Sequence, residues 1–348
     1  MSELILNDTP VRTSNNFLIN NIKLDNIEIP TQIKKFENVE INKQKSAIDE
    51  KVSTDKLVYG LGEDLEKQVL ENANSKINIE VLEKDDIQIV YDFDDNNTDL
   101  VNKIDILAKA DCNITIKYTS KTQKRCFHNG IIKVIADENA VVNIAIINLL
   151  NEQSDNFEAI ENISNSNSNI KYTIIDIGGK NSISNYYSNI IGDNANNALN
   201  TIYMGAKDEL KDINYIADVR GKKSNIDIDV QGALDENCKK NFKGTIDFKK
   251  GCTKSKGNEN EYCILLSEKA KSIALPMLLC TEDDVEGNHS TASGKVDNKE
   301  LFYIMTRGIS RREAIKLMVK AKFNNILKNI KNEELKAEII EVIDERLT

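Results

Sequence analysis

This 348-residue chain contains three side chains that are candidate metal ligands: His289, Cys280 and Glu286. His289 stands in the small-residue stretch GNHSTASG (residues 287–294), shortly after the other two. Imidazole, thiolate and carboxylate groups all bind iron or zinc. We expect a metal or cluster site here, with missing ligands supplied by a fold-back of the chain or by a second subunit. The alternative is an imidazole that is only solvated or hydrogen-bonded.

We expect structural roles for the remaining histidine and for the cysteines in general, apart from the candidate Cys280. His128 lies beside Cys126 and Phe127 and is expected to be structural. None of the six cysteines has CxxC spacing, so in a large cytosolic chain we expect reduced thiols that act as small buried hydrophobes.

A basic run follows the histidine. Between Arg307 and Lys331 there are eight basic residues and one acidic residue, although the chain carries a net charge of −10. Residues 312, 316 and 320 share one helical face. The run is a solvated face, a docking surface for an acidic partner, or a membrane-surface helix, and the acidic remainder of the chain disfavours the last. The candidate partner-binding residues are Phe302, Tyr303, Arg307, Arg311, Arg312, Lys316 and Lys320.

The common enzyme signatures are missing from the sequence. There is no GxxxxGK[ST] loop, no GxGxxG at a strand–helix junction and no GxSxG elbow, and the stretch IGGKNS (residues 177–182) lacks a following helix. A β-helical enzyme acting on polysaccharide would need an acid/base pair, and none is evident. We expect a protein that is not an enzyme.

Composition narrows the class of protein further. Aromatic residues make up 5% and tryptophan is absent, so isoleucine, leucine and valine must build the core. The acidic balance disfavours nucleic-acid binding. The chain start has no signal-peptide pattern, and its most apolar stretch (residues 140–150) is too short to span a bilayer. We expect a cytoplasmic protein with no membrane association.

Alternating apolar and polar residues dominate the middle of the chain. A short helix is expected within residues 57–75, and from residue 76 the two-residue period persists for nearly two hundred residues without a confident long helix. This pattern leaves a sandwich, an open barrel or a solenoid. Strand bursts of four to seven residues, recurring every fifteen to twenty, favour the rungs of a β-helix.

The two ends of the chain differ from this middle. We expect residues 1–56 to form a loosely packed arm and residues 287–294 to form a flexible linker. Three helices should follow, with Asp297 capping the first, Gly308 ending it, and Ser310 with Glu313 forming a capping box for the second. The apolar face of the second helix is formed by Ile315, Val319, Phe323, Ile326 and Ile330.

Three ordered blocks connect the chain to a known family. FKGTIDFKKGC (242–252), ILLSEKAKSIALPMLL (264–279) and DDVEGNHSTASGKVDNKELFYIMTRGISRREA (283–314) resemble the SufB/SufD family of iron–sulfur cluster assembly proteins. The resemblance implies a right-handed parallel β-helix core. It implies domains at 1–75 (irregular and helical), 76–285 (β-helix) and 286–348 (a helical module).

The resemblance also implies partners. The C-terminal helices would dock on SufC, an ABC-type ATPase, and the last rungs would pair with a SufB-type scaffold or with a second copy of this chain. His289 matches the histidine of the family's HGAT motif, which implies a ligand for a transient cluster or iron at the subunit interface. No tightly bound cofactor is expected.

Departures from the family pattern favour a SufD-like chain. Ser290 and Thr291 replace the residues of SufB-type members, and Ala270 stands where these carry their scaffold cysteine. The alternatives are a structural or regulatory β-helix protein without metal chemistry, and a SufB-like homodimeric scaffold.

Overall fold

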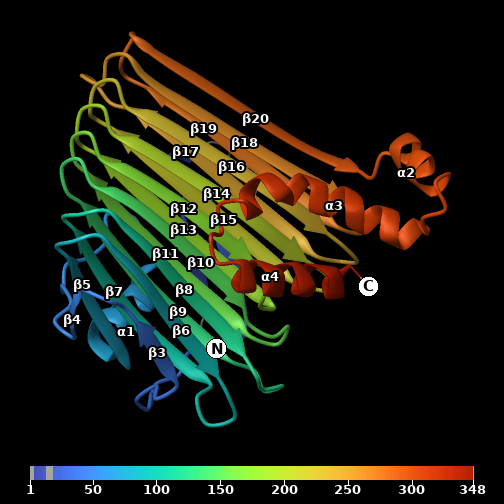
Figure 1. The fold of residues 1–348 in the computed structure, drawn as a ribbon, viewed down its shortest axis with the longest axis horizontal. Helices are drawn as coiled ribbons and strands as arrows, with labels where there is room; N and C mark the ends of the chain where they lie inside the picture. Colours follow the sequence, from blue (N-terminus) through green and yellow to red (C-terminus); the bar gives the residue numbers. More distant parts are fainter. Residues whose placement is uncertain (1–3, 13–18, 348) are drawn as a thin grey trace.

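Most of the chain winds into a parallel β-solenoid, as the sequence predicts. The computed structural model describes residues 4–12 and 19–347. Successive strands alternate between two facing sheets, each with eight parallel strands and one antiparallel strand at its N-terminal edge (Figure 1). Sheet I contains β3 (Val39–Asn42), β6 (Asp85–Phe93), β8 (Cys112–Ser120), β10 (Val141–Leu149), β12 (Asn169–Asp176), β14 (Asn196–Gly205), β16 (Asn225–Leu234), β18 (Ser255–Leu265) and β20 (Val285–Lys295). Sheet II contains β4 (Ala47–Asp49), β5 (Ser75–Val81), β7 (Asp99–Ala108), β9 (Phe127–Ala136), β11 (Asp155–Ser164), β13 (Asn181–Ile190), β15 (Leu210–Val219), β17 (Lys239–Phe248) and β19 (Lys271–Cys280).

The strands are longer than the sequence pattern indicates. The parallel strands have 7 to 11 residues, so the expected length of four to seven is wrong. The register pairs Asp155 with Asn181 and Lys239 with Lys271, which gives 26 to 32 residues for each full turn of two strands. The discrepancy arises because polar side chains such as Asn156 and Glu158 also occupy buried strand positions and interrupt the hydrophobic alternation.

Inward-facing side chains fill the lumen between the two sheets. In β8, Ile114, Ile116 and Tyr118 point inward and are buried. Further along the axis, four aromatic rings meet edge to face with centroids 5.1 to 6.1 Å apart. These rings belong to Tyr172, Tyr186, Tyr215 and Phe242. Each turn therefore buries its apolar row against the same row of its neighbours.

One corner of the solenoid repeats a left-handed backbone conformation. Asn139, Asn167 and Asn194 occupy equivalent turns with φ of 65°, 59° and 56°. Their amides form a ladder, in which the N–H of Asn139 donates to the carbonyl of Ser166 and that of Asn167 donates to the carbonyl of Asp193. Asparagine adopts this conformation more readily than most residues. The high asparagine content thus has a structural role at these corners.

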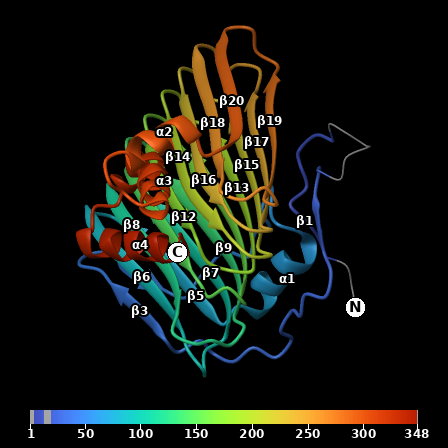
Figure 2. The ribbon, with the colours of Figure 1, turned by 90° about the vertical axis from the view of Figure 1, so that its right-hand side faces the viewer.

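The N-terminal segment is docked on the solenoid, so the expected loose arm is wrong for its described residues. Strands β1 (Leu4–Leu6) and β2 (Ile22–Leu24) pair antiparallel. Together with α1 (Glu63–Asn72), they cover the outer face of sheet II (Figure 2). The buried Asn7 donates to Asp212 Oδ1 at 2.7 Å, and Lys243 Nζ donates to the Asn7 carbonyl at 2.9 Å. These contacts join residues 205 and 236 positions apart in the sequence, so a local pattern could not predict them.

The three expected C-terminal helices are present. They are α2 (Asn298–Met305), α3 (Arg311–Leu327) and α4 (Glu333–Arg346). Asp297 and Ser310 accept the predicted N-cap hydrogen bonds, and Gly308 has a φ of +84°. None of the helices in the described part of the chain has the length and apolarity needed to cross a bilayer.

Helices α3 and α4 pack on the outer face of sheet I. Val319, Phe323 and Ile326 form one buried cluster with Ile202 and Met204 of β14. At the rim of this contact, Lys117 pairs with Glu338 at 2.5 Å, and Arg346 pairs with Glu209. The helices are thereby fixed to the solenoid.

The predicted flexible linker at residues 287–294 is instead part of strand β20. This strand pairs in parallel with β18 over eleven positions, from Val285 to Lys295. Small and polar residues can form this strand because backbone hydrogen bonds hold it to β18. No further turn of the described chain packs against it, so its side chains need not be apolar. His289 therefore belongs to the solenoid.

Replacing Phe323 by alanine should weaken the contact between α3 and sheet I. The ring is completely buried, so we expect a loss of about 3–5 kcal/mol in the free energy of unfolding. Denaturant unfolding followed by far-ultraviolet circular dichroism measures this. Leu317→Ala on the exposed side of the same helix is the control and should change stability by less than about 1 kcal/mol.

Candidate functional site

The last turn of the solenoid is an open end. Among the described strands, β20 pairs only with β18 and β19 only with β17, so each leaves one edge unpaired. The side chains of β20 are exposed along nearly its whole length, including those that face the lumen. Unpaired strand edges carry free N–H and C=O groups and readily pair with another chain. This end is a surface suited to a partner.

His289 lies in the middle of β20, opposite Glu259 in the register with β18. Side chains alternate between the two faces of a strand. Ser293 faces the lumen, because its hydroxyl lies 2.8 Å from that of Ser272 on the opposite sheet. His289, four positions earlier, therefore also faces the lumen and is exposed there.

Cys280 and Glu286 do not join His289 in one cluster. Cys280 ends β19 at the turn before β20, and its thiol donates to the Glu282 carbonyl at 2.9 Å. Glu286 lies on the outer face of β20, where it pairs with Lys256 at 2.9 Å. No group of three or more histidine, cysteine or acidic residues within 4–12 and 19–347 is placed to hold a metal ion. A site with three or more such ligands at His289 therefore needs at least one ligand from outside the described residues.

Two buried carboxylates of β18 lie directly beneath the open turn. Glu259 and Glu261 are completely or almost completely buried. Glu261 Oε1 accepts from Lys240 Nζ at 2.8 Å and from the Tyr203 hydroxyl at 2.7 Å. Both oxygens of Glu259 and the second oxygen of Glu261 have no hydrogen-bond partner among the described residues. Burial, with a smaller contribution from Glu261, raises the pKa of Glu259 to about 8.

Sequence reasoning missed these two carboxylates. The signal was present in NENEYC (residues 258–263), where acidic residues occupy alternate positions of a strand. Alternation alone, however, cannot tell which face is inward, since the other alternate positions are also polar.

The second histidine lies deep in the lumen, as expected for a structural residue. His128 is fully buried between Asn156 and Asn102, with ring nitrogens 2.6 and 2.9 Å from their side-chain oxygens. Burial lowers the pKa of His128 to about 4. Nearby, burial raises the pKa of Glu158 to about 7 while its carboxylate accepts from the Tyr118 hydroxyl.

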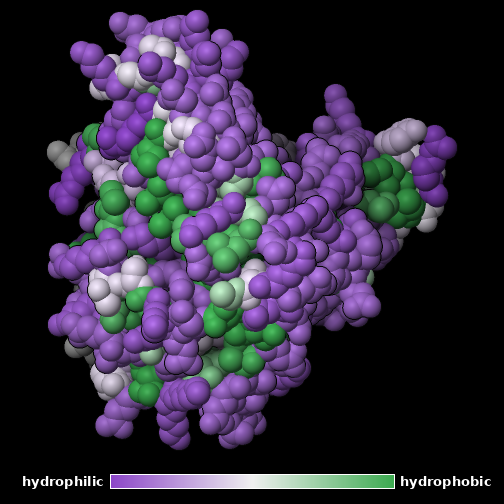
Figure 3. Space-filling model, turned by 60° about the vertical axis from the view of Figure 1, so that its left-hand side comes forward, coloured by the Kyte–Doolittle hydropathy of each residue, from purple (hydrophilic) through white to green (hydrophobic). Residues whose placement is uncertain are grey.

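Helix α2 presents the most exposed aromatic side chains of the described chain. Phe302 and Tyr303 are 69% and 60% exposed, and Met305 is exposed beside them. The space-filling view shows an apolar cluster on this protruding helix (Figure 3). Arg307 lies over the Tyr303 ring, 5.2 Å from its centroid. We call Phe302, Tyr303, Met305 and the exposed Leu317 of α3 the α2–α3 patch.

The predicted basic face is only partly available to a partner. Arg311 and Arg312 are exposed. Lys320 pairs with Asp344 of α4 at 2.8 Å, and Lys316 lies 4.0 Å from Glu313. Lys320 therefore joins α3 to α4, whereas Lys316 forms an ion pair within α3.

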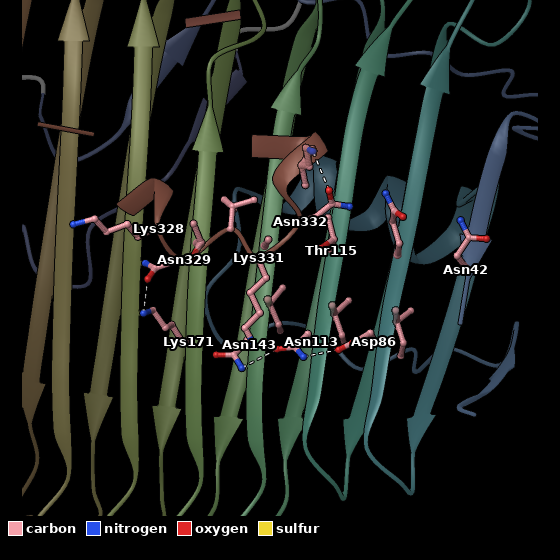
Figure 4. Close-up of a pocket in the computed structure, with 18 residues that line it drawn as sticks. Asn42, Asp86, Asn113, Thr115, Asn143, Lys171, Lys328, Asn329, Lys331 and Asn332 are labelled. Carbon is pink, nitrogen blue, oxygen red and sulfur yellow. Dashed lines mark hydrogen bonds between the residues drawn. The ribbon is translucent and has the colours of Figure 1, made fainter. Parts of the chain in front are cut away.

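A cavity of about 580 Å³ lies between sheet I and the turn joining α3 to α4 (Figure 4). Lys171 donates to Asn329 at 2.7 Å, and Lys331 donates to Asn113 at 2.9 Å. The lining contains one carboxylate, Asp86, and neither histidine nor cysteine. The cavity thus lacks a carboxylate pair or a nucleophile with its base, and its polar groups join the helices to the sheet.

Five of the six cysteines are buried and one is exposed. Burial raises the pKa of the Cys112 and Cys238 thiols to about 12 and of the Cys126 and Cys252 thiols to about 11. Only Cys280 is exposed. The expectation of buried thiols is confirmed except at the position named as a candidate ligand.

The long parallel solenoid, with its open end and exposed helical patch, defines the chain as a β-helix protein. Residues 93–322 match the family model of the SUF system FeS cluster assembly SufBD core domain. The chain belongs to this family, and among its relatives it is most like SufD.

Individual proteins of the SufB/SufD family are also similar to this chain in sequence. The chain is 26% identical over 265 residues to the iron–sulfur cluster assembly protein SufD of Bacillus subtilis, covering 75% of this chain and 61% of that protein. It is 32% identical over 162 residues to a SufBD family protein of Pyrococcus horikoshii, covering 45% and 35% of the two chains. It is 26% identical over 106 residues to SufD of Escherichia coli, covering 30% and 25%. The chain spans less than two thirds of the length of these relatives.

Thiol labelling of the native protein should modify one cysteine quickly. Cys280 is exposed, whereas the other thiols are shielded and hold their protons, so iodoacetamide at neutral pH should add one fast equivalent per chain. Mass spectrometry locates and counts the adducts. Cys280→Ser should remove the fast equivalent, and fast labelling of that variant would contradict the burial of the other five thiols.

Proposed function

We propose that this chain is a SufD-like subunit of a SUF iron–sulfur cluster assembly complex. The observation that carries the proposal is the open last turn, which presents His289 to the lumen beside two unpaired strand edges. The similarity to proteins named SufD supports it. Ala270, nearly buried at the turn before β19, offers no thiol where the scaffold cysteine of SufB-type members is expected.

The open end is the proposed dimerisation surface. A SufB-type scaffold, or a second copy of this chain, would pair with β19 and β20 and so extend both sheets across the interface. The partner would then supply the ligands that His289 lacks in this chain. Iron or a nascent cluster would be the cargo held there transiently, and we expect no resident cofactor.

The α2–α3 patch is the proposed docking surface for a SufC-type ABC ATPase. Exposed aromatic side chains near arginines are typical of interface hot spots. Here Arg307 lies over the Tyr303 ring, and the exposed Arg311 and Arg312 follow a few residues later in the sequence. Because α3 and α4 are packed on sheet I, ATP-driven movement of the ATPase could pull on the solenoid whose last turn carries His289. The unpaired thiols of all six cysteines suit a reducing compartment, and we place the protein in the cytoplasm.

Aspartate at Phe302 and Tyr303 together should weaken binding of the ATPase at least tenfold. The substitutions remove two large apolar contacts and add charge without touching a buried contact of the solenoid. An anaerobic pull-down from the native host identifies partners, and calorimetry with the purified ATPase gives the affinity. Ile191→Asp, at an exposed apolar site on the solenoid, is the control and should bind normally. If the wild-type chain does not bind a SufC-type ATPase, the proposed function fails.

Replacing His289 by alanine should lower the yield of cluster on the reconstituted complex several-fold while leaving complex formation intact. The imidazole is exposed in the free chain, so its loss should not disturb folding. Iron and sulfide analysis of the anaerobic complex measures the yield. Asn288→Ala, on the outer face of the same strand, is the matched control. An unchanged yield for the alanine variant would reject a ligand role for His289 and leave the purely structural alternative.

A further inference from the structure

We propose that Glu259 is a second metal ligand of this chain, and that Glu259 and His289 together hold a divalent cation of the Fe(II) class in the mouth of the lumen. The inference rests on the proposed function, which places His289 near iron, and it deepens that function by assigning a ligand one turn further inside. The site would belong to this subunit before any partner completes it.

The register brings the two side chains together. Glu259 of β18 and His289 of β20 are directly paired neighbours in sheet I. Both point into the lumen, as shown for β18 by the burial of alternate residues from Ser255 to Cys263. Neighbouring strands lie about 4.8 Å apart, so a carboxylate and an imidazole at paired positions can reach one ion.

Glu259 lacks any internal compensation. Its side chain is completely buried, and neither carboxylate oxygen meets a donor in residues 4–12 and 19–347. Leaving a buried polar group unpaired costs about 1–3 kcal/mol and more for a charge. A native interior rarely accepts that cost without a function or a ligand.

Lys240, a buried cation of β17, already pairs with the neighbouring acid Glu261. Lys240 Nζ lies 2.8 Å from Glu261 Oε1 and also donates to the Ile273 carbonyl at 3.3 Å. Two carboxylates and one ammonium leave one negative charge over when both acids are ionised. This negative charge would attract a cation entering beside Glu259, and a divalent ion would more than offset it.

A glycine on the opposite sheet makes room for the carboxylate at this level of the lumen. A Cβ added at Gly244, on the opposite sheet, would lie 2.2 Å from Glu259 Oε1. The carboxylate therefore occupies the space that a side chain at residue 244 would fill. On the other side the exposed residues of β20 open the site to solvent, so an ion can reach it through the last turn.

The ligand pair defines the kind of ion. Imidazole with carboxylate suits Fe(II), Co(II), Mn(II) and Zn(II), whereas Mg²⁺ and Ca²⁺ prefer oxygen ligands alone. Two protein ligands leave coordination positions for water or for groups of a partner subunit. Such a site could deliver iron to the interface.

Anaerobic titration of the full-length chain with Co(II), as a spectroscopic probe for Fe(II), tests the inference. Calorimetry and the visible absorption of the bound ion report affinity and ligand set. Glu259→Gln and His289→Ala should each weaken binding at least tenfold and change the absorption spectrum. Glu286→Gln, on the outer face of β20, is the matched control and should bind within about twofold of wild type. Circular dichroism of each variant shows whether the solenoid is intact.

The outcomes separate this inference from the proposed function. If His289→Ala weakens Co(II) binding while Glu259→Gln binds as wild type, Glu259 is only a buried protonated acid, and the inference is overturned while the assembly role stands. If the wild-type chain binds no Co(II), this chain has no site of its own, and the inference also fails. The proposed function is tested separately, by ATPase binding and by the yield of cluster on the complex.

Discussion

The narrow lumen between the two sheets is the constraint on which the structure depends. Every second side chain of each parallel strand enters it, and the next turn lies only one strand spacing away. An inward residue must therefore match the residues above and below it in shape or in hydrogen bonding. Tyr172, Tyr186 and Tyr215 satisfy this rule by edge-to-face contact. Asn156 satisfies it by donating to Ser182 on the next strand.

The same constraint explains why the two ends differ. At the N-terminal end, the antiparallel strands β3 and β4 close the sheets, and Phe36 packs on Tyr91 and Phe93 to cover the lumen. The two faces are covered as well, by the N-terminal segment on sheet II and by α3 and α4 on sheet I. At the C-terminal end, β19 and β20 have no such cover in the described chain. The strand edges and the exposed His289 of this end are open to a partner or an ion, although buried polar atoms without a hydrogen-bond partner also occur along the rest of the described solenoid.

The local sequence pattern was enough to predict those structural features that depend on residues close together in the sequence. The β-helix, the helix near residue 65 and the caps at Asp297 and Ser310 follow from alternation and from capping chemistry, and each is present. Other features depend on pairing between turns of the solenoid, which no local pattern encodes. They are the number of residues in each turn, the docking of Asn7 and the strand at residues 287–294. For the candidate site, His289 was found through its motif. Glu259 could not be, because its significance comes from the register with β20 and from burial.

The positions of the FKGTI residues in β17 explain how the fold forms the proposed site. Phe242, Gly244 and Ile246 point into the lumen, and the glycine faces the carboxylate of Glu259 across it. The aromatic and aliphatic residues fill their levels, whereas the missing side chain at Gly244 leaves space for a polar group. A purely structural solenoid would gain by filling that level with an apolar side chain and removing the acid. The chain instead retains a glycine opposite an unpaired carboxylate, one strand below an exposed histidine, and so places an acid where an apolar pair could pack.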